Sequence, residues 1–360
     1  MANDHKAINL SQGFPDFPVS KELIERVNHY MTQGHNQYAP MAGVASLRDQ
    51  ISRLISNQYG FDTNSETEIT ITSGATEALF STIAALIKQG DEVIVFDPAY
   101  DSYDPAIRLA GGKAIHLPLR TPKFNIDWDL LSQKVNKRTR MIVVNTPHNP
   151  SGTILSDKDM SQLEVFAEDH DLLVLSDEVY EHIVFDLQKH QSALKYPKLR
   201  NRCIAVFSFG KTFHATGWKV GYLVAPQYLT DEIRKMHQYI TFSVSTPVQY
   251  AIADYLKNSE NYTNLGSMYQ QKRDFFLDKL KDSRFEAIAS EGTYFQLLSY
   301  QGIAGHSDIE MAKRLTVENG VASIPISVFY ENKQDHKLLR FCFAKSEETL
   351  SSAAEILCKI

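Results

Sequence analysis

Short apolar runs alternate with amphipathic segments over the first two thirds of the chain. Seven segments have the pattern of strands, and several of them are short, continuous apolar runs, as in strands that helices cover on both faces. The seven segments lie at residues 68–72, 92–96, 113–117, 141–145, 172–176, 203–207 and 220–224. Between them, a helix is expected over 76–89 with Gly90 as its stop, and another after Ser156, which forms a capping-box pattern with Asp159. The alternation predicts an α/β protein with a mostly parallel seven-stranded sheet and helices on both faces.

The pattern changes after about residue 227. Long helical segments follow over roughly 229–282, with an interruption near Thr246 and Pro247. Short strands are then expected at 293–300, 321–329 and 338–343, mixed with helices at 307–319 and 346–359. This order predicts a smaller α+β domain. We expect a large domain over residues 36–270 and a small domain made of residues 1–35 and 271–360.

Composition excludes several classes of protein. The chain has 37 basic and 43 acidic residues and a net charge of -6, which favours neither nucleic acid nor an anionic membrane. Three cysteines without a CxxC pair argue against a disulfide framework or a zinc ribbon, and no metal site is expected. The longest apolar stretch ends at Lys88, too short to span a bilayer, and the N-terminal residues lack a signal-peptide pattern. We expect a soluble, cytoplasmic protein.

Polar clusters follow five of the predicted strands, at the sheet edge where α/β proteins bind ligands. Small residues at 72–76 before a helix favour a phosphate cradle of backbone N–H groups. Tyr100 can offer a flat face to a ring, and the proline-rich loop 145–152 can hold the Asn149 amide rigidly. His148 in that loop is expected to be structural or solvent-facing. A capped helix start, a surface turn and ordinary loop chemistry are the alternatives for these three clusters.

The other two clusters carry charge. Asp177 follows an apolar run, so its carboxylate is expected at the edge of the core, where it needs a cation, with Tyr180 nearby. Lys211 stands among apolar and small residues near Lys219, so burial and like charge favour a neutral, nucleophilic amine. A helix N-cap and a solvated lysine are the alternatives. A phosphate cradle, a stacking aromatic ring, an acid and an imine-forming lysine together match the needs of pyridoxal 5′-phosphate. Nucleotide-loop, zinc-protease and serine-hydrolase motifs are absent.

Seven segments resemble, in family order, those of the fold-type I, class I/II aminotransferases that depend on pyridoxal phosphate. The resemblance runs from Ile8 to the C-terminus and favours the methionine and kynurenine (aromatic) aminotransferase group. It implies the PLP-dependent transferase fold type I and a homodimer with shared active sites. The segments are SQGFPDF at 11–17, NQYAPMAGVASLR at 36–48, TSGATEAL at 72–79, NTPHNPSG at 145–152, SDEVYEH at 176–182, SFGKTFHATGWKVGY at 208–222 and LLRFCFAK at 338–345.

The resemblance also implies roles for the residues around the cofactor ring. Lys211 is expected to bind the cofactor covalently and then carry the proton between substrate and cofactor. Asp177 is expected to pair with the pyridine nitrogen, and Tyr180 and Asn149 to hydrogen-bond the ring hydroxyl. Tyr100 is expected to stack on the ring.

Phosphate and substrate binding are implied in the same way. The phosphate is expected to be held by the backbone at Ala75 and Thr76, by Ser208, by Lys219, and by Tyr38 of the neighbouring subunit. Many relatives have Arg where Lys219 stands, and Lys provides the charge without the planar fork. The substrate carboxylate is expected to meet Arg340, with the Gly13 backbone and Asn149 beside it.

The implied reaction is a ping-pong transfer of the amino group of an L-amino acid to a 2-oxo acid. The resemblance favours methionine or aromatic donors over aspartate, and no second arginine can be assigned to a side-chain carboxylate. The main alternative is a cysteine-S-conjugate β-lyase on the same fold, which shares the cofactor residues. A cofactor-sensing regulator would need a DNA-binding domain, for which the chain before Ser11 has no room. An inert α/β scaffold is the remaining alternative.

Overall fold

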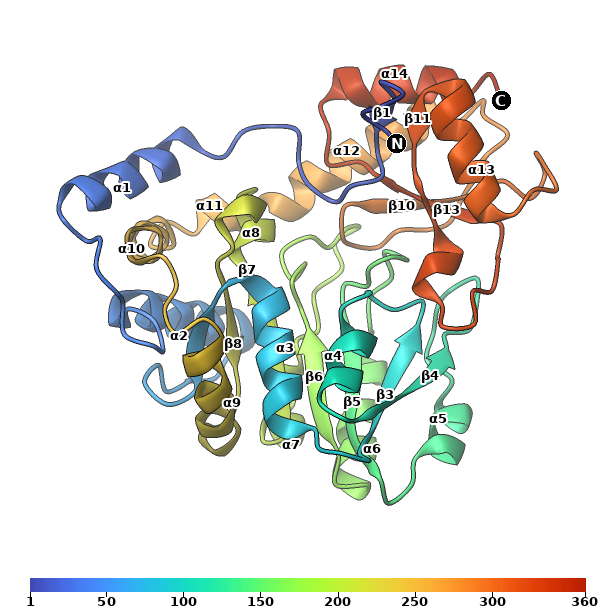
Figure 1. Cartoon of the computed structure of the whole chain (residues 1–360). Coiled ribbons are helices and arrows are strands. Elements are labelled where there is room, and N and C mark those ends of the chain that lie inside the picture. The colour runs from blue at the N-terminus through green and yellow to red at the C-terminus, as the bar shows by residue number, and fades with distance from the viewer.

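A central sheet of seven strands organises the molecule, and the computed structural model describes all 360 residues (Figure 1). Its strand order is β2-β8-β7-β6-β5-β3-β4, and every neighbouring pair is parallel except the two that involve β8. Each strand lies within two residues of its predicted position, which confirms the α/β class. The strands are β2 Ile69–Thr72, β3 Glu92–Asp97, β4 Lys113–Pro118, β5 Thr139–Asn145, β6 Leu173–Asp177, β7 Cys203–Ser208 and β8 Gly221–Val224.

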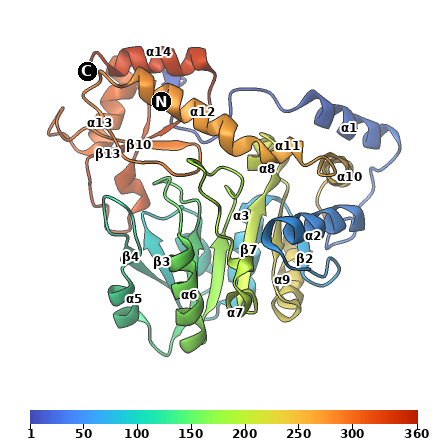
Figure 2. The same cartoon turned by 180° about the vertical axis from the view of Figure 1, so that it is seen from behind.

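Helices cover both faces of this sheet because successive strand residues point to opposite sides. Val93 and Val95 of β3 pack with the helices on one face, whereas Ile94 and Phe96 belong to the core on the other. The first face carries α3 Gly74–Leu86, α4 Tyr103–Leu109 and α9 Gln227–Ile240; the second carries α2 Ala45–Tyr59, α5 Trp128–Lys134, α6 Asp157–Asp169 and α7 Pro197–Arg200. Figure 1 shows α3, α4 and α9 in front of the sheet, and Figure 2, the view from the opposite side, shows α2, α6 and α7 in front of it.

Helix ends follow the local sequence at one helix and depart from it at another. Ser156 and Asp159 form the predicted capping box at the start of α6. The predicted stop at Gly90 is wrong, because α3 ends at Leu86 and Ile87 turns into an extended conformation that buries its side chain. Gly90 instead has a φ of +87° and donates its N–H to the carbonyl of Gly111, which shapes the turn into β3.

The C-terminal third builds a second sheet above the first (Figure 1). It contains four antiparallel strands in the order β12-β13-β10-β9, and a separate parallel pair joins β1 Ile8–Asn9 to β11 Val321–Ala322. The first residues of the chain therefore pack with its last part. The remaining elements are α8 Phe209–Thr212, β9 Glu286–Ala287, β10 Phe295–Ser299, α13 Asp308–Arg314, β12 Ile324–Pro325, β13 Leu338–Cys342 and α14 Glu347–Leu357, with a π-helix at Leu315–Asn319 and 3₁₀ turns at Ala193–Lys195, Thr216–Trp218 and Ile326–Phe329.

Helices link the two parts. α1 Lys21–Thr32 lies against α10 Thr246–Tyr255, and α11 Glu260–Thr263 leads into α12 Leu265–Lys279. Pro247 is at the second position of α10, where it fits because no intrahelical N–H bond is lost there. The single strand expected over 321–329 is wrong, because two short strands and a 3₁₀ turn replace it. The domain limits at residue 270 stay a prediction, since α12 crosses that position without a break. No helix is both long and apolar enough to cross a membrane.

Removal of the Ser156 cap is expected to weaken α6. Ser156→Ala loses the hydroxyl that accepts the Asp159 N–H, so the free energy of unfolding falls by about 1 kcal/mol. Denaturant unfolding followed by circular dichroism measures this change. Ser259→Ala is the matched control, because exposed Ser259 precedes α11 without a side-chain cap bond and its loss is expected to change little. Equal effects in both variants would contradict the capping account.

Candidate active site

A cavity of about 500 Å³ lies at the carboxyl ends of the central strands and reaches the second sheet. Polar residues from β5, β6 and β7 line it from below, and Arg340 of β13 lines it from above. The structure brings together there every site residue predicted from the sequence except Tyr38. Those lining residues are Gly13, Ala75, Thr76, Tyr100, Asn149, Asp177, Tyr180, Ser208, Lys211, Lys219 and Arg340.

Asp177 is a buried carboxylate without a cationic partner. It ends β6, is 3% exposed, and forms no ion pair with any side chain of the protein. Its Oδ2 accepts a 2.6 Å hydrogen bond from the Tyr103 hydroxyl, and burial raises its pKa to about 6. The Tyr103 bond opposes that rise without abolishing it. A positive group in the cavity would therefore be strongly stabilised beside Asp177.

Lys211 is an amine in the same cavity, on the short helix α8 that follows β7. Its Nζ donates to the Tyr294 hydroxyl at 2.7 Å and to the Gly13 carbonyl at 3.3 Å, and it forms no ion pair. Burial lowers its pKa to about 8, and the positive charges of Arg340 and Lys219 act in the same direction. A large fraction of a lysine with this pKa is neutral near pH 8, so the amine can act as a nucleophile or a base.

The start of α3 forms an open anion cradle. The cap residue Ser73 makes no side-chain bond to the first turn, so backbone N–H groups at Ala75 and Thr76 remain for a ligand. Because Gly74 and Gly221 have no side chain, Lys219 and the start of β8 can approach the first turn of α3 closely. A Cβ on Gly74 would lie 3.2 Å from Lys219 Nζ, and one on Gly221 would lie 2.9 Å from the Ala75 nitrogen. The close approach of Lys219 to this helix start suits a phosphate group.

Arg340 presents a second unpaired charge. Its guanidinium lies 4.0 Å from the centre of the Phe295 ring, the residue is 8% exposed, and no carboxylate pairs with it. Nη1 donates to Asn149 Oδ1 at 2.6 Å and Nη2 to the Ser11 carbonyl at 3.2 Å, while the buried Nε has no partner. Burial lowers the pKa of this group. A carboxylate ligand would satisfy both the charge and the free N–H.

The rest of the upper wall is apolar. Ile324, Val328 and Phe329 line the cavity beside Phe295. The only cations on the lining are Lys211, Lys219 and Arg340, and exposed Asp101 adds a negative charge. The wall therefore favours an apolar substrate side chain over an acidic one.

Two predicted residues have different surroundings from those expected. Tyr38 is 83% exposed, lies outside the cavity and contacts the ring of Phe242 edge-on. His148 is structural but not solvent-facing, because it is buried and bonded to the Ser151 hydroxyl and the Pro98 carbonyl. Burial lowers its pKa to about 4, so the ring is neutral.

Sequence reasoning missed several supporting residues. Tyr103 holds Asp177, and Asn145 accepts the N–H of Asn149 while it donates to the Asp177 carbonyl. Tyr103 could have been predicted from its position, because it lies three residues after Tyr100, which belongs to a predicted cluster at the sheet edge. Asn145 begins the segment NTPHNPSG, but the resemblance implies a role only for Asn149 within it. Tyr294 gave no signal, because its segment has the pattern of an ordinary core strand.

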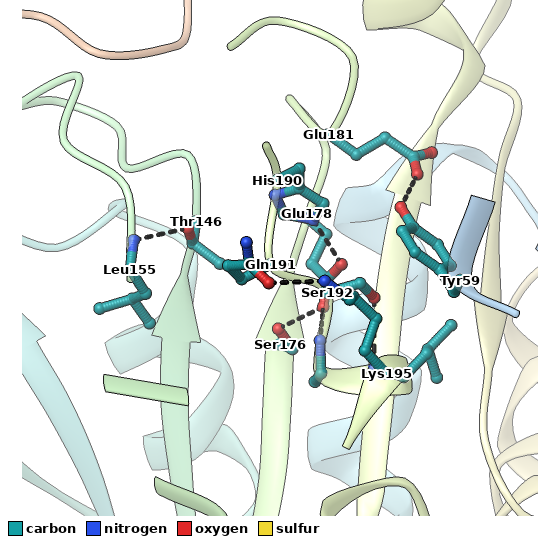
Figure 3. A network of polar contacts seen from close by, with 12 residues as sticks. Tyr59, Thr146, Leu155, Ser176, Glu178, Glu181, His190, Gln191, Ser192 and Lys195 are labelled. Atoms are coloured by element: carbon teal, nitrogen blue, oxygen red, sulfur yellow. Dashed lines mark hydrogen bonds and ion pairs between the residues drawn. The ribbon is translucent and has the colours of Figure 1, made fainter. Parts of the chain in front are cut away.

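The buried carboxylate of Glu178 holds the turn that follows β6 and carries Tyr180. Figure 3 shows its polar contacts. Glu178 accepts hydrogen bonds from the Ser176 hydroxyl at 2.7 Å and from the Ala193 N–H at 2.9 Å, and His190 Nε2 lies 2.7 Å from its other oxygen. Its neighbour Glu181 is bonded to the hydroxyls of two tyrosines, and burial raises its pKa to about 8. These contacts fix the backbone on which the Asp177 carboxylate depends.

The fold is that of a known class of enzyme. Residues 5–357 match the family model of aminotransferase class I and II, so the chain belongs to that family and is an aminotransferase, as the sequence predicted. The methionine aminotransferase of Escherichia coli K12 is 51% identical over 358 residues, which cover 99% of this chain and 93% of that protein. Human kynurenine–oxoglutarate transaminase 3 is 33% identical, over 99% of this chain and 86% of its own.

Solved structures agree with this assignment. The structure of an E. coli protein identified as a methionine aminotransferase superposes with a TM-score of 0.98 at 50% identity, over 100% of this chain and 94% of the other. The N-succinyldiaminopimelate aminotransferase of Mycobacterium tuberculosis gives a TM-score of 0.96 at 34% identity, over 99% and 94% of the two chains. The predicted fold class and family are therefore confirmed.

Neutralising Asp177 is expected to stabilise the cofactor-free chain at high pH. The folded-state pKa of about 6 is above the ordinary value of 3.8, so the unfavourable charge develops as the pH rises through 6. Asp177→Asn removes that charge and is expected to raise the free energy of unfolding at pH 8 by about 1–3 kcal/mol, and by less at pH 5. Denaturant unfolding at both pH values measures the difference.

Asp282→Asn is the control for this measurement, because Asp282 is exposed. It is expected to leave stability unchanged at both pH values. An Asp177→Asn chain that is less stable than wild type at pH 8 would show that Asp177 is compensated within the protein after all.

Proposed function

We propose that this aminotransferase uses pyridoxal 5′-phosphate and transfers the amino group of methionine or an aromatic amino acid to a 2-oxo acid by a ping-pong mechanism. One observation carries the proposal: Lys211, Asp177 and Arg340 line one cavity, and none is paired with an opposite charge of the protein. Three unpaired charges of these signs are costly unless ligands compensate them. The cofactor and an amino-acid substrate together provide such compensation.

The residues fit the cofactor in several respects. Asp177 offers an anion for a protonated ring nitrogen, and the α3 cradle with Lys219 and Ser208 offers donors for a phosphate. Tyr100 lines the cavity as a candidate stacking ring. When bound, pyridoxal 5′-phosphate acts as an electron sink for the carbanion that forms at the substrate Cα.

The protein's own groups would do the remaining work. Lys211 Nζ, with its lowered pKa, would take the proton from the substrate Cα and hold it for return. Arg340 would orient the substrate through its carboxylate, with the Gly13 backbone beside it. Since Asn149 Oδ1 is occupied by Arg340, the Asn149 Nδ2 is left to donate to the ring hydroxyl together with Tyr180.

Cavity chemistry supports an apolar donor. Each cation on the lining has a role with the phosphate, the reacting atoms or the α-carboxylate, so a side-chain carboxylate would lack a partner and face Asp101. Ile324, Val328 and Phe329 suit a thioether or an aromatic ring. Family membership alone does not decide this, because a 30% identical relative from Pyrococcus abyssi is named an aspartate aminotransferase.

We further propose a cytosolic homodimer. All three cysteines are free. Tyr38 and Tyr239 are more than four-fifths exposed, and Ile240 and Phe242 add apolar surface, which a second copy of the chain would cover. Tyr38 would then reach the phosphate site of the partner subunit.

A donor panel tests the substrate assignment. Methionine, phenylalanine, kynurenine and aspartate are each assayed with several 2-oxo acids, and kcat/KM is expected to be about tenfold or more higher for the first three donors than for aspartate. An unpaired buried side-chain carboxylate is the physical reason for the difference. A preference for aspartate would contradict the proposal.

The same panel separates the β-lyase alternative. A cysteine S-conjugate is incubated without any 2-oxo acid, and pyruvate and ammonia are measured. Little release is expected, whereas sustained release faster than transamination would favour the lyase.

Substitution of Lys211 tests the cofactor assignment. Borohydride treatment of the wild type is expected to fix one cofactor covalently per chain, on the peptide that contains Lys211. Lys211→Ala is expected to lose this covalent mass and to lower turnover by about 10²–10⁴-fold or more, because the amine that moves the proton is gone. Intact and peptide mass spectrometry measure the attachment. Lys235→Ala, at an exposed lysine on α9, is the control and should match wild type; retained attachment in Lys211→Ala would refute the assignment.

A further inference from the structure

Tyr294 is a buried residue that contacts the Lys211 amine but has no assigned part in the proposed mechanism. It lies just before β10 and is 0% exposed. Its hydroxyl accepts a hydrogen bond from Lys211 Nζ at 2.7 Å and donates one to the Gly13 carbonyl at 2.5 Å. Lys211, Tyr294 and Gly13 therefore form a chain of contacts between the reacting amine and the N-terminal segment.

The direction of these bonds follows from the chemistry of the groups. A carbonyl oxygen can only accept, so the single phenol hydrogen of Tyr294 is committed to Gly13. Towards Lys211, the phenol oxygen must then act as an acceptor. One N–H of the amine points to Tyr294 and a second to the Gly13 carbonyl, so the lone pair of the neutral amine is directed away from both.

The surroundings keep the phenol in this orientation. The Tyr294 ring packs edge-on against Tyr180 and Phe295, with centroids 5.1 and 4.9 Å away. Gly13 can approach only because it lacks a side chain, since a Cβ there would lie 2.6 Å from the Phe295 ring. The segment around Gly13 is itself fastened, because Lys345 donates to the Phe14 carbonyl at 2.7 Å.

We propose that Tyr294 is a positioning residue for Lys211: it holds the amine by one N–H so that the nitrogen lone pair faces the cavity. This inference rests on the proposed function, in which that lone pair takes the substrate proton. Tyr294 acts through Lys211, and its phenol keeps its own proton because burial raises the pKa of the group.

The proposal has a consequence for the charge state of Lys211. A phenol oxygen that accepts from the amine favours the ammonium form over the neutral form, so loss of the hydroxyl is expected to lower the lysine pKa further. The other titratable groups that act on the amine belong to β6 and the turn after it, to the segment before β8, and to β13. Asp177, Lys219, Arg340 and Cys342 act on the amine through their charges, and the Tyr180 ring lies 5.6 Å from Lys211 Nζ. All five groups are unchanged in the variants below.

The experiment compares wild type, Tyr294→Phe and Tyr269→Phe as cofactor-free full chains. Lysines are pulse-labelled with acetic anhydride across a pH series, and mass spectrometry gives the midpoint for the Lys211 peptide. In Tyr294→Phe the pH midpoint of Lys211 labelling is expected to lie about one pH unit below that of wild type. Tyr269→Phe is the matched control, because Tyr269 is an equally buried tyrosine against the Tyr294 ring whose hydroxyl lies 3.0 Å from His214 instead of Lys211.

A second measurement uses the holoenzyme. Tyr294→Phe is expected to lower kcat by about tenfold with little change in the donor KM, because the amine acts after the substrate has bound. An unchanged Lys211 midpoint in Tyr294→Phe would overturn the proposal. An equal fall in Tyr269→Phe would also overturn it, since general loosening would then explain the effect.

Two further controls keep the result decisive. If Tyr294→Phe does not fold, 3-fluorotyrosine at position 294 retains the hydroxyl as a weaker acceptor, and a midpoint at or above wild type would refute the proposal. Failure of the proposed function would give a different result. Added pyridoxal 5′-phosphate would then not protect Lys211 of the wild type from acetylation by acetic anhydride. That result does not depend on the position of the midpoint in the variants.

Discussion

Three charged groups that enclose one cavity without neutralising one another are the constraint on which the structure depends. Asp177 and Arg340 are buried, and Lys211 is enclosed between them and other cavity residues, yet no ion pair forms. Folding alone would favour direct pairing or solvent exposure of such groups. The surrounding structure prevents both. Ligands that neutralise these buried charges therefore gain binding free energy from doing so.

Hydrogen-bonded side chains around the cavity maintain this arrangement. The Glu178 network fixes the turn after β6, Tyr103 holds the carboxylate of Asp177, and Asn149 ties the guanidinium of Arg340 to the loop after β5. Glu178 and Tyr103 are buried, Asn149 is partly buried, and all three are hydrogen-bonded, so the charged groups have few alternative positions. This is preorganisation of the kind that electrostatic catalysis needs, because little reorganisation remains when charge develops.

The central sheet and most of the cavity lining were predictable because their causes are local. Strands covered on both faces need continuous apolar runs, and parallel strands place the residues that follow them at one edge. Contacts between distant segments were not predictable. The bond from Arg340 to Asn149 joins a strand of the second sheet to the loop after β5, and Tyr294 has the sequence pattern of an ordinary core residue beside β10. The end of α3 was missed for a related reason, because burial of Ile87 overrode the glycine signal.

Because β1 pairs with β11, the cavity is completed late in the synthesis and folding of the chain. Residues 8 and 9 find their strand partner only at residues 321 and 322, and the carbonyl of Ser11 is bound by Arg340. During synthesis the first segment must therefore wait, unpaired, while the whole central sheet emerges from the ribosome. A nascent chain can assemble the seven strands early, but the cavity stays incomplete until β13, which carries Arg340, has been translated.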